Sequence, residues 1–465
     1  MMKELFLALS TAGALGILGC RSPEPDLPVD TTADERRPAK KASDPPASAS
    51  KTIDLATALR IAASGHLDVL EGRARVREAQ GRAAGADGYL LPVLSVGAAV
   101  SNLRGQAQSS FGDVKEVNFY TVNALGTVRI STNVGEAIYR DLAAHRTVEA
   151  ASGFEVAQLQ RAFFEVSVSY LGLVESDGTV RIQEQFLQEA QTLVRITQAR
   201  AAQGLGTALD AERAQAQAAA AEQRLLGARN ERQRRSKLLA TALRLDATVD
   251  LIPADRDLAP ASLVDPVEDL PRWLSRALER RQEILALQSN REAARDEASA
   301  IRWSVWGPEV SAGAAFGVLG KSFSTLDERG TWIVSAGWSF SLGGPGRIEA
   351  ADARAQQAEI TLQRFQDRLQ ASVAGAYHEL ALARRQLEPS QRELTAAENA
   401  LRIARANYEG GLLAETDFLL IQQGADQARL RRLGAVARFN QAQLQLLAES
   451  GVASIDTLSG GAAPK

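Results

Sequence analysis

The stretch LPVLSVGAAVS, residues 91–101, returns in altered form as GPEVSAGAAFG at residues 307–317. Each copy follows a helical stretch that opens with Asp-Leu, at Asp54 and at Asp269. Later landmarks keep one common offset, and they are Tyr170 with Tyr377, Gly204 with Gly411, Leu205 with Leu412, and Asp210 with Asp417. Agreement in this order over so long a span indicates an internal duplication.

Each copy has the same predicted organisation: a helix of about 30 residues, two strands, a very long helix, a turn and a returning helix. No proline occurs between Pro92 and Pro253. The first long helix can therefore run from near Gly135 to Gln203, which is roughly 100 Å at 1.5 Å per residue. Residues at heptad spacing, apolar except for Asn440, predict coiled-coil seams, and they are Leu159, Phe163, Val166, Tyr170 and Leu173, then Leu433, Ala437, Asn440, Leu444 and Leu447.

These patterns predict six segments. They are a signal peptide at 1–19, a disordered proline-rich tether at 20–51, a first repeat at 52–250, a linker at 251–268, a second repeat at 269–450 and a flexible tail at 451–465.

The strands alternate strictly between apolar and polar residues. One face of each strand is apolar: Leu94, Val96, Ala98 and Val100; Val122, Ala124, Val128 and Ile130; Trp332, Val334, Ala336, Trp338, Phe340 and Leu342. Such alternation over about ten residues is typical of transmembrane β-strands, but a half-buried soluble sheet has the same period. Four strands cannot close a barrel, and an open edge in lipid leaves backbone groups unpaired. A membrane sheet would therefore have to be shared between chains.

Residues 1–20, MMKELFLALSTAGALGILGC, have Lys3 before an apolar run that is shorter than a bilayer span. The run ends at Cys20, which is the single cysteine of the chain. This resembles a bacterial lipobox, where the cysteine carries a diacylglycerol anchor. An ordinary signal peptide cleaved nearby, with Cys20 incidental, is the alternative.

Composition excludes several classes of function. The chain has 53 basic and 56 acidic residues and a net charge of −3, so nothing indicates binding to nucleic acid. One cysteine and three histidines in 465 residues argue against a metal centre. No phosphate loop, nucleophile motif or His–Glu metal spacing is present, so we expect no enzyme and no cofactor.

Taken together, the duplication, the helices and the strands resemble the TolC family of outer-membrane efflux proteins, in its lipoprotein branch, over about residues 53–450. The resemblance implies a mixed α/β membrane protein, with long antiparallel coiled-coil helices forming a periplasmic α-barrel. Four strands per protomer would contribute to a twelve-stranded transmembrane β-barrel in a homotrimer. It also implies partners, namely a periplasmic adaptor, an inner-membrane pump and outer-membrane lipid. The chain would be a passive exit duct, lipid-anchored in the outer membrane and extending into the periplasm.

The family's adaptor-docking turns match ARAAQGLGTALDAERAQAQ at 199–217 and ANYEGGLLAETDFLLIQQ at 406–423. Glycines there permit the positive φ of a tight helix reversal, and Thr or Asp suits the start of the returning helix. Leucines in the turns are expected to be exposed, which favours docking over a plain helical hairpin. Gly410 is one of the glycines expected to permit the reversal, and the candidate docking residues are Gly204, Leu205, Gly206, Thr207, Asp210, Gly411, Leu412, Leu413, Thr416 and Asp417.

Four charged residues near the second turn, Glu398, Arg402, Arg405 and Glu409, recur at helical spacing. They are candidate gate charges between protomers, or a solvated helix face. For the whole chain, the rival interpretation is a soluble periplasmic coiled-coil adaptor. The alternation of two hairpins with two strand pairs argues against it.

Overall fold

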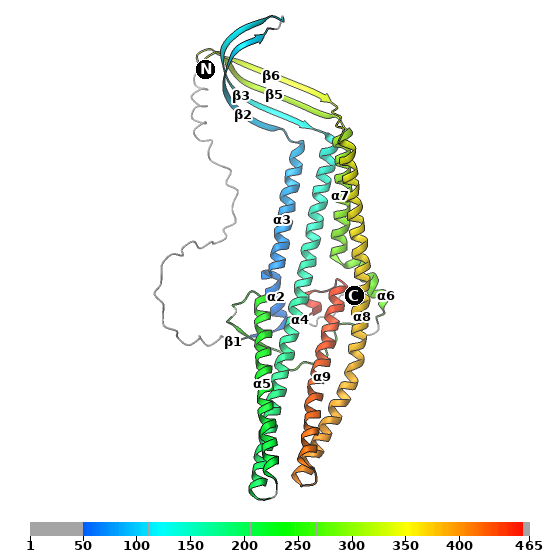
Figure 1. Ribbon diagram of the computed structural model, residues 1–465. Helices are drawn as coiled ribbons and strands as arrows, with labels where there is room; N and C mark the ends of the chain where they lie inside the picture. Colours follow the sequence, from blue (N-terminus) through cyan, green and yellow to red (C-terminus); the bar gives the residue numbers. More distant parts are fainter. Residues whose placement is uncertain (1–49, 110–111, 205, 247, 266–267, 459–465) are drawn as a thin grey trace, which may run out of the picture. The chain divides into compact units, whose positions relative to one another are not determined.

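The computed structural model describes residues 50–109, 112–204, 206–246, 248–265 and 268–458 (Figure 1). The first half contains β1 (Ser50–Ile53), α2 (Leu55–Gly65), α3 (Leu67–Asp87), the 3₁₀ turn η1 (Gly88–Leu90), β2 (Val93–Gln108), β3 (Val114–Thr132), α4 (Val134–Ala202) and α5 (Ala208–Ala242). The second half contains β4 (Asp250–Pro253), α6 (Leu270–Arg280), α7 (Gln282–Trp306), β5 (Glu309–Gly320), β6 (Leu326–Gly337), α8 (Gly344–Glu409), α9 (Glu415–Glu449) and α10 (Ile455–Leu458). The two halves follow the same order of elements.

Each opening helix is broken once, where the sequence predicts one continuous helix. His66 separates α2 from α3 and Arg281 separates α6 from α7, each with one residue in extended conformation. At the second break the Arg281 guanidinium donates to the carbonyl of Ala448 at the end of α9 and also to Glu283 (2.9 Å). This contact fixes the break against a segment far along the chain.

The helix α4 is as continuous as the absence of proline predicts, and α8 is also one helix although it contains Pro389. The 69 residues of α4 pack against α3 and α7, and also against α5 and α9. In the second half, α8 packs against α7 and α9. Figure 1 shows the four long strands continuing from the ends of α3, α4, α7 and α8, opposite the turns α4–α5 and α8–α9.

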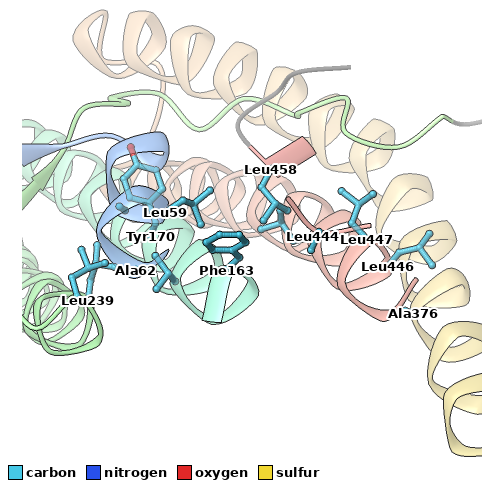
Figure 2. Packing of buried hydrophobic residues seen from close by; sticks show 14 of the residues in the cluster. Leu59, Ala62, Phe163, Tyr170, Leu239, Ala376, Leu444, Leu446, Leu447 and Leu458 are labelled. Atoms are coloured by element: carbon cyan, nitrogen blue, oxygen red, sulfur yellow. The ribbon is translucent and has the colours of Figure 1, made fainter. Parts of the chain in front are cut away.

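The main hydrophobic core lies where the two halves meet, midway along the helices (Figure 2). Its members come from all the helices except α3 and from the short strands β1 and β4, and they include Leu59, Phe163, Tyr170, Leu239, Ala376, Leu444, Leu447 and Leu458. The predicted seam on α4 is thus buried. The Tyr170 hydroxyl donates to Asp255 in the linker (2.8 Å). Burial raises the pKa of Tyr170, which keeps this hydroxyl a donor.

One position in the predicted α9 seam does something other than apolar packing. The Asn440 amide accepts from the backbone N–H of Ala261 (2.8 Å) and donates to the carbonyl of Ala259 (2.9 Å). Gln443, one turn later, accepts from Leu263 N–H (2.9 Å). These two buried amides hold the linker on α9.

The ordered part of the chain is longer at both ends than the sequence indicates. β1 begins at Ser50, inside the expected tether, because it pairs in parallel with β4 of the linker. The expected flexible tail is wrong from residue 451 to residue 458, since Gly451 is buried and Ala453 and Leu458 lie in the core. Cys20 and the predicted signal peptide lie outside the described residues.

The four long strands form one antiparallel sheet in the order β2-β3-β5-β6. Pairing of β3 with β5 joins the two halves of the chain, with Val128 opposite Ala314. Within the described ranges, no helix is at once long and apolar enough to cross a membrane.

Candidate functional site

The sheet carries its apolar residues on one face, in register across all four strands. Leu94 lies opposite Val128, Val128 opposite Ala314, and Ala314 opposite Trp332. Directly opposed residues share a face, so the predicted alternation is confirmed. This face is open, with Val96 92% exposed and Trp332 81% exposed. An apolar area of this kind across four strands indicates a surface meant for a non-aqueous environment.

The opposite face of the sheet is largely polar, with alanine and a few larger apolar residues among its members. Ser311 and Ser335 hydrogen-bond there across β5 and β6 (2.7 Å). The prediction for the last strand was too long, because β6 ends at Gly337 and Trp338, Phe340 and Leu342 follow it. Those three side chains are nevertheless exposed.

A close-packed joint attaches the sheet to the helices. The Asn133 side chain caps α4 by accepting from Glu136 N–H (3.1 Å), and it donates to the carbonyl of Trp303 at the end of α7 (2.8 Å). The Trp303 indole covers Gly135, where an added Cβ would lie 2.2 Å from the ring. A side chain at position 135 would therefore force the Trp303 indole or the helix to shift.

The first helical turn, between α4 and α5, has the conformation that its sequence predicts. Gly204 adopts φ +72°, which a residue without a Cβ tolerates. Thr207 caps α5 by accepting from Asp210 N–H (3.2 Å), and the Asp210 carboxylate accepts from Thr207 N–H (3.1 Å). This reciprocal pair is a capping box. Gly206 does not use a positive φ, and Leu205 lies outside the described residues.

The second turn, between α8 and α9, differs from prediction in its cap and in one leucine. Gly411 adopts φ +74°, whereas Gly410 is helical. The N-cap residue before α9 is Ala414, so Thr416 and Asp417 do not cap the helix but lie exposed within its first turn. Asp417 still complements the positive end of the helix.

The two leucines of the second turn have different environments. Leu412 is 82% exposed, as the docking hypothesis expects. The expected exposure of Leu413 is wrong, because Leu413 packs against the apolar cluster around Tyr408 and Phe418. Leu209, beside the first turn, is an exposed leucine that sequence reasoning missed.

One arginine clamps the two turns together. The Arg200 guanidinium donates to the carbonyls of Tyr408 (2.8 Å) and Glu409 (3.0 Å), which end α8. Its centre also lies 4.7 Å from the centroid of the Tyr408 ring. Tyr408 stacks on Phe418 at the start of α9, with ring centroids 4.9 Å apart. Sequence reasoning missed Arg200, because its partners lie more than 200 residues away.

A buried carboxyl group lies beside this clamp. Glu415, the first residue of α9, is buried and faces Asp210 of α5. Burial, followed by the charge of Asp210, raises the pKa of Glu415 to about 7. The hydrogen bonds from Thr207 lower the pKa of Asp210. The pKa values of the two carboxyl groups are therefore shifted in opposite directions.

The candidate gate charges make contacts within the chain. Glu398 pairs with Arg429 (3.4 Å) and Arg405 pairs with Glu189 (3.9 Å). Arg402 and Glu409 have exposed side chains. Sequence reasoning missed the buried acid of this region, Asp426. Burial, then the neighbouring Glu189, raises the pKa of Asp426 to about 7.

Two groups of side chains have metal-ligand chemistry and proximity. They are His66 with Asp68 and Glu165, and Asp87 with Asp141 and His145. In the second group the His145 Nε2 atom lies 3.5 Å from each Asp carboxylate. Both groups are at least partly exposed, and exposed acidic groups of this kind are common without an ion.

Comparison with known proteins identifies the same architecture elsewhere. A family model described as outer membrane efflux protein matches residues 58–243 and 273–452. The pyoverdine export outer membrane protein OpmQ of Pseudomonas putida is 26% identical over 469 residues, covering 96% of each chain. The outer-membrane channel OprN superimposes with a TM-score of 0.76 at 20% identity, covering 86% of this chain and 90% of its own. VceC from Vibrio cholerae superimposes with a TM-score of 0.74 at 20% identity, covering 85% of this chain and 96% of its own.

Proposed function

The chain belongs to the outer membrane efflux protein family, and on that premise we propose that it assembles as a homotrimeric exit duct whose helical turns dock a periplasmic adaptor. The efflux role itself follows from the family, which also makes the chain a transport protein rather than an enzyme or a soluble coiled-coil protein. The observation that supports the membrane role of the sheet is the single exposed apolar face in register across four strands.

Sharing of the sheet between chains follows from its edges. The order β2-β3-β5-β6 leaves one edge of β2 and one edge of β6 unpaired in a single chain. In lipid those backbone groups must be satisfied. Because the four strands alternate in direction, β6 of one protomer can pair antiparallel with β2 of the next. Three protomers would then close twelve strands, as in the family that the sequence resembles.

Adaptor docking is assigned to the exposed residues of the turns. Leu412 offers an apolar side chain to solvent at a position with no packing role, whereas the adjacent Leu413 packs inward. Exposed leucine at a helical turn stabilises nothing in the isolated chain and suits a protein partner. An inner-membrane pump, coupled through that adaptor, would supply the energy for export.

A photocrosslinker placed at Leu412 tests docking directly. In the native host, p-benzoylphenylalanine at position 412 should form an adduct whose second component is a periplasmic adaptor, identified by mass spectrometry. The same probe at Leu413 is the matched control and should react within its own chain. Adducts from position 412 that contain only a second copy of the channel would refute the assignment.

A substitution separates docking from assembly. Leu412→Asp should abolish export while trimers remain intact, since the side chain makes no buried contact. Leu413→Asp should instead disturb the turn itself. Undiminished export by the Leu412→Asp variant would remove this residue from the docking surface.

The lipid anchor is proposed on sequence grounds. Cys20 is the single cysteine and ends the apolar leader run. Mass spectrometry of the mature protein should find an amino-terminal cysteine carrying a diacylglycerol, and Cys20→Ser should lose that mass without losing trimers. A mature chain that begins at another residue would overturn the proposal.

A further inference from the structure

Glu415 occupies a position that an ionised carboxylate tolerates poorly. It is 7% exposed, and neither of its carboxylate oxygens accepts a hydrogen bond from any described residue. A buried carboxylate without a donor is strongly unfavourable, whereas a protonated carboxyl needs only an acceptor. The environment of Glu415 is therefore suited to the acid form.

An acceptor is present on the facing helix. Asp210 of α5 lies within hydrogen-bonding reach of Glu415 of α9. The capping box with Thr207 satisfies part of the Asp210 carboxylate and keeps it ionised. A protonated Glu415 can donate its O–H to Asp210, and this bond joins the first hairpin (α4 and α5) to the second (α8 and α9).

The other charged and titratable groups described around Glu415 do not donate a hydrogen bond that would stabilise its ionised form. Arg213 of α5 is exposed and only moderates the repulsion between the two carboxyl groups. Arg200 of α4 already donates to the ends of α8, and Tyr408 of α8 stacks beneath it. Among the described residues of α4, α5, α8 and α9, none donates a hydrogen bond to Glu415.

We propose that Asp210 and Glu415 form a proton-controlled latch between the two hairpins at the helical turns. With the proton present, the O–H···O⁻ bond holds α5 and α9 together. Once the proton is lost, two facing carboxylates repel each other and the hairpins separate at their turns. This consequence rests on the proposed function: the latch would make the adaptor-docking end of the duct respond to periplasmic pH.

The direction of the pH effect follows from the titration of Glu415. Its pKa is about 7 with the turns together, against an ordinary value of 4.5 when exposed. The latched form is thus fully favoured below about pH 4.5 and loses that advantage as the pH rises through about 7. The latched-to-open ratio changes at most tenfold per pH unit across this interval, about 300-fold in all.

A second buried acid on α9 provides an internal comparison. Asp426 also has a pKa of about 7, caused by burial and by Glu189 of α4. It differs from Glu415 because Arg429 lies beside it, 3.7 Å from Asp426 and 3.5 Å from Glu189. This arginine stays charged and offsets the repulsion, so ionisation of Asp426 leaves the helices together.

The latch is tested by the distance between α5 and α9 near the turns. Spin labels at Ala216→Cys and Leu420→Cys, both exposed, are placed in full-length detergent-solubilised protein carrying Cys20→Ser. Double electron–electron resonance then measures the distance from about pH 5.5 to about pH 8.5. We expect a short distance at acidic pH and a growing longer population above pH 7.

Variants decide which group is responsible. Glu415→Gln keeps the shape and supplies an uncharged amide donor to Asp210, so the short distance should persist at every pH. Glu212→Gln, which removes an exposed charge from the same turn of α5, and Asp426→Asn should both retain the pH response. The latch is overturned if the distance still depends on pH in Glu415→Gln. It is also overturned if the pH response is lost in Asp426→Asn but kept in Glu415→Gln.

The same distances separate the latch from the docking proposal. Suppose that the distance changes with pH through Glu415 while crosslinking from position 412 does not change with pH. That result would support the latch and contradict its link to docking. A constant distance in the wild-type chain would overturn the latch, whatever the turns bind.

Discussion

Replacement of Arg200 by Gln should loosen the contact between the two helical turns without unfolding the chain. The arginine donates two hydrogen bonds to the carbonyls that end α8, and its guanidinium lies over the Tyr408 ring. Glutamine is shorter and uncharged, so it cannot span both carbonyls and has no cation–π attraction. The matched control is Arg195→Gln, because Arg195 on the same helix bonds only within α4, to Thr192.

The size of the effect follows from those contacts. Hydrogen bonds from a charged donor contribute about 1.5–3 kcal/mol each, and an exposed cation–π contact about 0.5–1 kcal/mol. Arg200 is only half-buried and the freed carbonyls regain water, so we expect a net loss of about 2 kcal/mol. That free energy corresponds to about 30-fold in the opening equilibrium.

Hydrogen exchange of the detergent-solubilised protein measures this opening. Amides of residues 408–413 and of the first turn of α9 should exchange about 30-fold faster in Arg200→Gln, while the strands of the sheet remain unchanged. Arg195→Gln should leave all these rates as they are. An acceleration below threefold at the turns, or an equal one in the control, would refute the clamp.

Three further substitutions, one of them with a control substitution, test the fold. Gly135→Ala forces a Cβ to within 2.2 Å of the Trp303 ring. The free energy of unfolding should fall by about 1–3 kcal/mol, and the yield of assembled protein on unboiled gels should fall with it. An unchanged yield would show that the indole moves aside freely. Gly317→Val places a Cβ 2.0 Å from a carbonyl oxygen of β3 and should prevent assembly. The control Gly97→Ala, whose added Cβ has no atom within 4 Å, should assemble normally. Equal yields of the two variants would contradict the β3–β5 pairing. Tyr170→Phe removes the buried hydrogen bond to the linker and should lower the unfolding midpoint by a few degrees, so an unchanged midpoint would show that the bond contributes little.

Features set by local pattern could be predicted from the sequence. The length of α4 follows from a long proline-free stretch, and its predicted limits near 135 and 203 differ by one residue from Val134–Ala202. The strand faces follow from alternation, because the side-chain period of a strand is two whatever it pairs with. The glycines that reverse the helices, Gly204 and Gly411, are likewise local in origin.

Features set by distant partners could not be predicted. At the break, Arg281 donates to a carbonyl of α9 that is 167 residues away. The burial of Glu415 depends on α5, and the inward packing of Leu413 depends on Phe418 and Tyr408. The cap of α9 was misassigned because a threonine or aspartate cap was expected in both turns. The N-cap is Thr207 in the first turn, but the equivalent position in the second turn is Ala414.

The most direct test of the central claim is the native mass of the protein extracted with detergent from an outer-membrane fraction. A shared sheet predicts a particle with three times the mass of the processed chain, because four strands per chain leave two edges that only neighbouring protomers can satisfy. A monomer or dimer recovered without detergent would contradict the account, since the apolar face of the sheet would then be open to water.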